Sequence, residues 1–212
     1  MIRSSASRGL RIVAIAFLAI TVTGCSIALF PDNQALRIFT LPFGYEPATK
    51  ASQRSETLPM LKVVRPQASG VLAGKRLLIE SRPSELAAYS TMRWVADAPV
   101  LLRDHLVRAL RRTPGMSSVV TDASGAASEV ILTSNLLAFQ EIRTQQTPGV
   151  RIYLQAQLVE KGSRRILATR DFDIRVPVVE NQVRTVVAAM GKASDQLATE
   201  MADWIGFALA DY

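Results

Sequence analysis

The chain has 212 residues, with 25 Lys and Arg against 18 Asp and Glu, a single His and a single Cys. One Cys excludes an internal disulfide, and one Cys with one His excludes a structural zinc site, which needs four ligands. The net charge of +7 is spread along the chain without a long basic run, so the sequence argues against nucleic acid as a partner.

The first 24 residues have the layout of a secretory signal. An N-terminal segment with three Arg residues precedes an unbroken apolar run at 12–20. The small residue Gly24 then directly precedes Cys25. This stretch resembles a bacterial lipobox, which is cleaved just before the Cys after lipid has been attached to its sulfur, with Val22 in place of the usual Leu. Removal of this signal leaves 22 basic and 18 acidic residues, a net charge of +4.

The sequence predicts one covalent modification and no other cofactor. The thiol of Cys25 would carry diacylglycerol and its freed amine a further acyl chain such as palmitate, and two or three chains hold a protein on a bilayer almost permanently. By the same resemblance, Ser26 in place of Asp implies transfer to the outer membrane, with the protein facing the periplasm. The alternative is an uncleaved transmembrane anchor over 12–30, whose second half is poor in apolar residues.

The mature chain is interpreted as a short tether at 25–35 followed by one domain over 36–212. Alternating residues at 36–41 predict a strand that Pro42 ends, and 44–59 has the composition of a loop.

The next segments predict two strands and a helix. The strands are 61–64 and 76–79, and Ser84 with Glu85 predicts a short helical turn. Pro99 opens the helix, because Pro is favoured in the first helical turn. The apolar face of this helix is Leu102, Leu106, Ala109 and Leu110, and its basic face is Arg103, Arg108, Arg111 and Arg112.

After a short strand at 117–121, the remainder of the chain predicts a meander and a final helix. The three strands are 130–142, 150–158 and 166–176, and Asn181 is the predicted N-cap of the helix. Inward residues of the second strand are Val150, Ile152, Leu154, Ala156 and Leu158. Two amphipathic helices packed on a mostly antiparallel sheet of about seven strands make an α+β domain.

No catalytic motif is present. Asp171 and Asp173 lie two apart on one strand and could share a face for acid–base chemistry, but a solvated strand face beside Arg170 and Arg175 is the simpler interpretation. His105 lies within a helical pattern, where it is more typical of a helix boundary than of a catalyst.

The segment that begins at Tyr89 carries a second resemblance. Tyr89, the pair Arg93-Trp94 and Pro99 before a Leu-rich helix resemble the ABC-type transport auxiliary lipoproteins, which include the lipoprotein of the paraquat-inducible intermembrane transport system. The order of elements over 36–209 agrees with that family. These four residues are candidates for core packing or for partner contact, with Trp94 in the helix–sheet seam and Tyr89 anchoring its loop through its hydroxyl.

The resemblance implies a non-catalytic periplasmic accessory. Members of the family act beside an ABC permease and ATPase and a mammalian-cell-entry-type protein that move lipids between the inner and outer membranes. The chain would dock the distal end of the conduit at the outer membrane, where a homo-oligomer would suit a symmetric conduit. The alternatives are a structural or assembly lipoprotein without a transport role, and a periplasmic hydrolase, for which a nucleophile motif is missing.

Overall fold

The computed structural model describes residues 35–47, 58–116, 118–143, 148–179, 182–210 and 212. The predicted signal, Gly24, Cys25 and nearly all of the tether lie outside these residues. Residues Leu36–Tyr212 make up one compact unit. Its elements are β1 (Arg37–Phe39), β2 (Leu61–Val63), the 3-10 helix η2 (Gly70–Ala73), β3 (Arg76–Arg82), β4 (Glu85–Trp94), α2 (Ala98–Leu110), β5 (Val119–Thr121), β6 (Val130–Ile142), β7 (Gly149–Glu160), β8 (Ile166–Pro177) and α3 (Val183–Ala208).

The long strand β6 organises the sheet, because it is paired along both edges. One edge carries β7 and then β8, both antiparallel, as the meander predicts. The other edge carries two parallel partners, β2 near the start of β6 and β3 near its end. The strand order is β1-β4-β3-β6-β2-β5, with β7 and β8 on the far side of β6.

This arrangement corrects the predicted sheet in two respects. The sheet has eight strands rather than about seven, and it is mixed, since β1–β4, β2–β5, β2–β6 and β3–β6 are all parallel pairs. The α2 crossover lies in the chain between β2 or β3 and their partners β5 and β6. A crossover of that length returns the chain in the parallel direction, which sequence alternation alone does not reveal.

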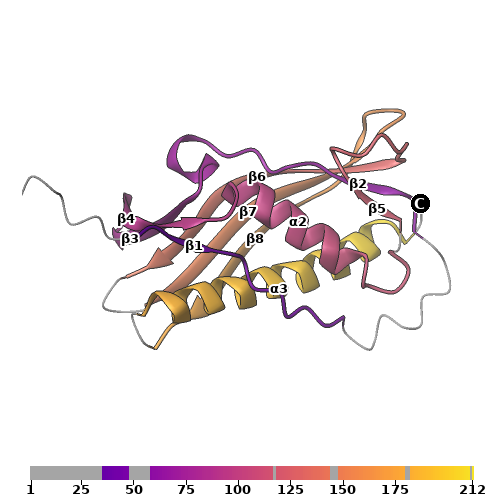
Figure 1. The fold of residues 1–212 in the computed structure, drawn as a ribbon. Helices are drawn as coiled ribbons and strands as arrows, with labels where there is room; N and C mark the ends of the chain where they lie inside the picture. The colour runs from indigo at the N-terminus through magenta and orange to yellow at the C-terminus, as the bar shows by residue number, and fades with distance from the viewer. Residues whose placement is uncertain (1–34, 48–57, 117, 144–147, 180–181, 211) are drawn as a thin grey trace, which may run out of the picture. The chain divides into compact units, whose positions relative to one another are not determined.

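Both long helices cover one face of the sheet (Figure 1). All five residues that were predicted to point inward from β7 are at most 1% exposed, which confirms that prediction. Phe172 of β8 meets Trp204 of α3 edge-on, with ring centroids 5.7 Å apart. The apolar face predicted for α2 is likewise buried, whereas Arg108, Arg111 and Arg112 are exposed.

The predicted helical turn at Ser84 and Glu85 is wrong. Pro83 and Ser84 form the two-residue turn of a hairpin, in which Arg82 pairs with Glu85 and Ser84 has φ of 66°. Proline followed by a residue with positive φ is typical of a type II turn. Tyr89, which was predicted to anchor a loop, is therefore part of strand β4, as is the segment that follows it to Trp94.

The segment 41–47 lies against both helices. Leu41 and Tyr45 are buried, and the Tyr45 hydroxyl lies 2.7 Å from Oγ1 of Thr113, just beyond α2. Gly191 of α3 comes so close that a Cβ atom there would lie 2.8 Å from Cβ of Pro42. The predicted strand at 36–41 is therefore shorter, as β1, and the loop predicted from residue 44 begins as a packed segment.

The N-terminal ends of the two helices differ slightly from the predictions. α2 begins at Ala98, one residue before Pro99, and Gln182 is the N-cap of α3, whereas Asn181 lies outside the described residues. No helix in the described part of the chain has both the length and the apolarity needed to cross a bilayer.

Candidate functional site

Trp94 and Pro99 lie where β4 leads into α2, and both are buried. The Trp94 ring packs against Phe139 of β6 with centroids 5.7 Å apart, and the side chain is 2% exposed. Its backbone N–H donates to the carbonyl of Lys75, which ties the end of β4 to the start of β3. Trp94 is thus placed in the core, in the helix–sheet seam. The indole Nε1 has no hydrogen-bond partner among the described residues.

Arg93 holds an irregular stretch of β4 together. The pairing of β4 with β3 shifts between Arg76↔Arg93 and Leu78↔Ala88, so several β4 residues lack a ladder partner. One nitrogen of the Arg93 guanidinium donates to the carbonyls of Tyr89 and Met92, each at 2.8 Å. A charged donor therefore binds carbonyl groups of residues that the bulge leaves without a partner on β3.

Tyr89 belongs to a different cluster, with Glu141 and Arg143. Its hydroxyl donates to Glu141 at 2.7 Å and accepts a hydrogen bond from Arg143 at 2.7 Å, while Arg143 also binds Glu141 at 3.0 Å. Burial, reinforced by Glu141, raises the pKa of Tyr89 to about 12. The hydroxyl stays protonated at neutral pH and positions the buried Glu141 carboxylate. Glu141 and Arg143 were not predicted as site residues, although two charged residues at the end of an apolar strand are a signal in the sequence.

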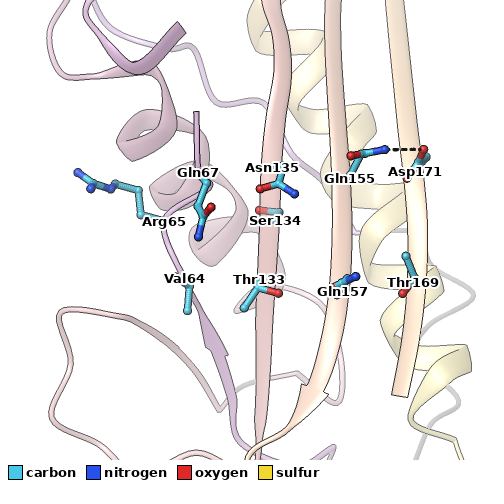
Figure 2. Close-up of a pocket in the computed structure, with 10 residues that line it drawn as sticks. All are labelled: Val64, Arg65, Gln67, Thr133, Ser134, Asn135, Gln155, Gln157, Thr169 and Asp171. Carbon is cyan, nitrogen blue, oxygen red and sulfur yellow. Dashed lines mark hydrogen bonds between the residues drawn. The ribbon is translucent and has the colours of Figure 1, made fainter. Parts of the chain in front are cut away.

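The sheet face opposite the helices carries a polar depression of about 440 Å³ (Figure 2). Side chains of β6, β7 and β8 point into it from neighbouring strands, and residues 64–67 form its rim. Hydroxyl, amide and carboxylate groups dominate its lining: Thr133, Asn135, Gln155, Gln157, Thr169 and Asp171. Such groups offer hydrogen bonds to a polar surface, but they include no activated nucleophile.

Asp171 and Asp173 lie on this open face, where each has partners. Asp171 accepts hydrogen bonds from Tyr153 at 3.0 Å and Gln155 at 3.1 Å. Asp173 accepts from Arg151 at 2.7 Å and from Arg175 at 3.1 Å. The bond from Arg151 holds the pKa of Asp173 below its ordinary value, which opposes a role as a general acid near neutral pH.

His105 is buried between α2 and α3. Its Nε2 lies 2.9 Å from Oδ1 of Asp195, whose other oxygen accepts from the backbone N–H of Gly44 at 3.1 Å. Burial lowers the pKa of His105 to about 4, although Asp195 acts in the opposite direction. The neutral ring therefore donates from Nε2, and the contact fastens the 41–47 segment to both helices. The His105 side chain is 1% exposed, so its ring is closed to a substrate, whereas that of Asp195 is 23% exposed.

Within the described residues, no three His, Cys, Asp or Glu side chains are grouped so that they could hold a metal ion.

The four residues named from the sequence fall into two groups. Arg93, Trp94 and Pro99 form a structural junction, and the Tyr89 hydroxyl belongs to a hydrogen-bonded cluster with other residues.

Comparison with known proteins identifies the family. The chain is similar to a Xanthomonas campestris protein of the domain family DUF330, with 25% identity and a TM-score of 0.71 over 81% of this chain and 95% of that one. An uncharacterized protein of known structure has 16% identity and a TM-score of 0.63 over 81% of this chain and 99% of its own, which indicates the same fold. A comparison with curated proteins finds no match. Residues 39–202 match the model of the ABC-type transport auxiliary lipoprotein component, and the chain therefore belongs to that family.

Proposed function

We propose that this chain is a lipid-anchored, non-catalytic accessory of an intermembrane lipid transport system. It acts at the periplasmic face of the outer membrane, beside an ABC permease, an ATPase and a mammalian-cell-entry-type protein. The observation that carries this proposal is the family match over residues 39–202, which spans α2, all three strands of the meander and most of α3.

The anchor in this proposal is the lipid on Cys25. The lipobox from Val22 to Cys25 supports it, and Ser26 supports the outer membrane as the destination. Two or three acyl chains bury enough CH₂ groups to make release from the bilayer slow. The tether then limits how far the domain can move from the membrane surface.

The domain itself has the role of a docking body. A rigid core under α2 and α3 supports a sheet whose opposite face is polar and hollowed, and both features suit a surface that receives another protein. Trp94 and Pro99 contribute to docking indirectly, because they fix the junction of β4 and α2 rather than reaching the surface.

Replacement of Cys25 tests the anchor. The full chain should be found in the outer-membrane fraction and carry the mass of its acyl groups, whereas Cys25→Ala should lose both. Ser26→Asp is the matched control, since it should keep the lipid but move the chain to the inner membrane. Outer-membrane recovery of Cys25→Ala with no change in lipid mass would contradict the anchor.

Lipid transfer tests the transport role. In cells that lack the chain, movement of pulse-labelled phospholipid between the two membranes should slow, and the wild-type chain should restore it while Cys25→Ala should not. Normal transfer in cells with a weakened envelope would favour the structural or assembly role instead.

A further inference from the structure

Three exposed Arg residues lie in the last turn of α2 and just beyond its end. Arg108, Arg111 and Arg112 line a depression of about 460 Å³, which Asp104 and Val107 of α2 and Thr121 of β5 also border. The centres of two guanidinium groups lie over one aromatic ring, that of Arg108 at 3.6 Å and that of Arg112 at 4.7 Å from the centroid of Phe43. We call Arg108, Arg111 and Arg112 the α2 arginine face.

The guanidinium groups of the α2 arginine face form no direct ion pair within the described residues. Arg111 donates to the carbonyl of Val119 at 2.7 Å, and Arg112 donates to the carbonyl of Tyr45 at 3.5 Å, so both partners are uncharged. Among the described residues, no carboxylate lies within 4.0 Å of any of these three guanidinium groups. Burial lowers the pKa of Arg108 and the neighbouring Arg112 lowers it further, as two adjacent cations would, while the charges of Asp195 and Asp104 act in the opposite direction.

The nearby acids are already paired with other groups. Arg103 binds Asp104 at 2.8 Å and Asp122 at 2.6 Å. Asp195 is held by His105 and by the backbone of Gly44. Glu46, which follows Tyr45, is exposed and is the one acid in segment 41–47. Three guanidinium groups therefore border the depression beside one carboxylate, that of Asp104, which Arg103 already binds.

Guanidinium groups suit phosphate in particular. Their planar arrangement of N–H donors matches two phosphate oxygens at once, and they are more weakly hydrated than an ammonium group. Stacking on Phe43 restricts the Arg108 and Arg112 side chains, so that less conformational entropy is lost when a phosphate binds.

The length of the tether places this face within reach of a membrane. Cys25 and Leu36 are 11 residues apart, which spans at most about 40 Å when fully extended. Phe43 lies only seven residues beyond Leu36, and α2 with 13 residues is about 20 Å long. A domain held by Cys25 can therefore bring α2 to the headgroups of the same bilayer.

We propose that the α2 arginine face binds the phosphate groups of anionic phospholipids in the membrane that holds the Cys25 lipid. This inference rests on the proposed anchor. It adds an orientation, in which the helix-covered side of the domain faces the bilayer and the polar sheet face points away, toward the periplasm. Basic residues close to an anionic surface each strengthen membrane binding.

Vesicle binding by the unacylated mature chain, residues 25–212 with Cys25→Ser, tests the inference without the anchor. The chain should sediment with phosphatidylcholine vesicles that contain phosphatidylglycerol and not with phosphatidylcholine alone, and added salt should weaken binding. The variant Arg108→Gln/Arg111→Gln/Arg112→Gln should bind about 100-fold more weakly, about fivefold for each charge removed. The control Arg82→Gln/Arg164→Gln/Arg184→Gln changes net charge equally but lies elsewhere and should retain binding.

A second measurement needs no substitution. Hydrogen exchange in the chain with its Arg residues intact should slow in α2 when anionic vesicles are added, and exchange in β8 should not change. Equal losses of binding in both triple variants, or protection confined to β8, would each overturn the inference. Failure of vesicle binding leaves the anchor untouched, because the mass of Cys25 in the full chain tests that separately.

Discussion

The two faces of β6, β7 and β8 differ although the same three strands supply both. Toward the helices, Val150, Ile152 and Leu154 are at most 1% exposed and belong to one continuous core. Toward solvent, their neighbours carry amide, hydroxyl and charged groups around the depression in Figure 2. The covered face accounts for stability, whereas the open face is free to make contacts with another molecule.

A bulge keeps the two faces distinct along β6. Pairing with β7 shifts between Leu136 and Ala138, so Phe139 and Glu141 reach the covered face although the preceding buried residues are even-numbered. Leu137, the residue at the shift, is 45% exposed. Without this extra residue, Phe139 would point away from Trp94, and the seam between β4 and β6 would lose its aromatic contact.

The largest difference between the two faces should be in the free energy of unfolding lost when neighbouring residues of β7 are replaced. Leu154→Ala should lower the free energy of unfolding by about 3 kcal/mol, because it opens a cavity in the core. Gln155→Ala, one residue along and on the open face, should change it by less than about 0.5 kcal/mol. Urea denaturation measures both values, and equal losses would mean that the open face is also packed.

Acidic pH should lower the stability of the fold, because His105 on the covered side becomes protonated. The pKa of His105 is about 4 in the folded chain, against an ordinary value of 6.5, so the unfolded chain takes up the proton first. Stability from the neutral ring is complete above about pH 6.5 and is lost as the pH falls toward 4, by up to about 1.4 kcal/mol per pH unit. Urea midpoints for the wild type and His105→Gln between pH 7.5 and 4 should diverge in this range, and parallel curves would contradict the assignment.

A Cβ atom at Gly191 should disturb the packing of the 41–47 segment on α3. Alanine is the better helix former by about 1 kcal/mol, but its Cβ would lie 2.8 Å from Pro42 Cβ and 3.0 Å from the Pro42 carbonyl oxygen. Overpacking should outweigh propensity, so that Gly191→Ala lowers the melting temperature by several degrees. Gly162→Ala, with no atom within 4 Å of the new Cβ, is the control and should be neutral or slightly stabilising.

The smallest effect is expected from the ion pairs of the open face. Asp173→Asn should cost about 0–1 kcal/mol at neutral pH, since the Asp173 carboxylate is 38% exposed. Because the pKa of Asp173 is lowered, its contribution persists to acidic pH and fades only below the ordinary Asp value. A loss above 2 kcal/mol in urea titrations would show that this face contributes to stability as the core does.

The sequence predicted the meander and both helices because their patterns are local. The limits of β6 and the inward residues of β7 followed from alternation, and the faces of α2 followed from helical spacing. Parallel pairing of β2 and β3 with β6 depends on contacts between distant segments, so no local sequence pattern predicted it.

The candidate site residues could be predicted only in part from the sequence, because their partners are also distant along the chain. Tyr89 was expected to anchor a loop through its hydroxyl, but it lies on strand β4 and its hydroxyl partners Glu141 and Arg143 are more than 50 residues away. His105 and Asp195 are separated by 90 residues and meet only when α2 packs on α3. The polar depression combines short stretches of four chain segments, each of which alone is typical of a solvated strand.

Affinity capture of the tagged full chain from native membranes tests the proposed function most directly. An ABC permease, its ATPase and a mammalian-cell-entry-type protein should be recovered together with the wild-type chain, and Cys25→Ala should recover less of them. Recovery of the lipidated chain without any of these three proteins, from membranes that contain them, would contradict a role in intermembrane transport.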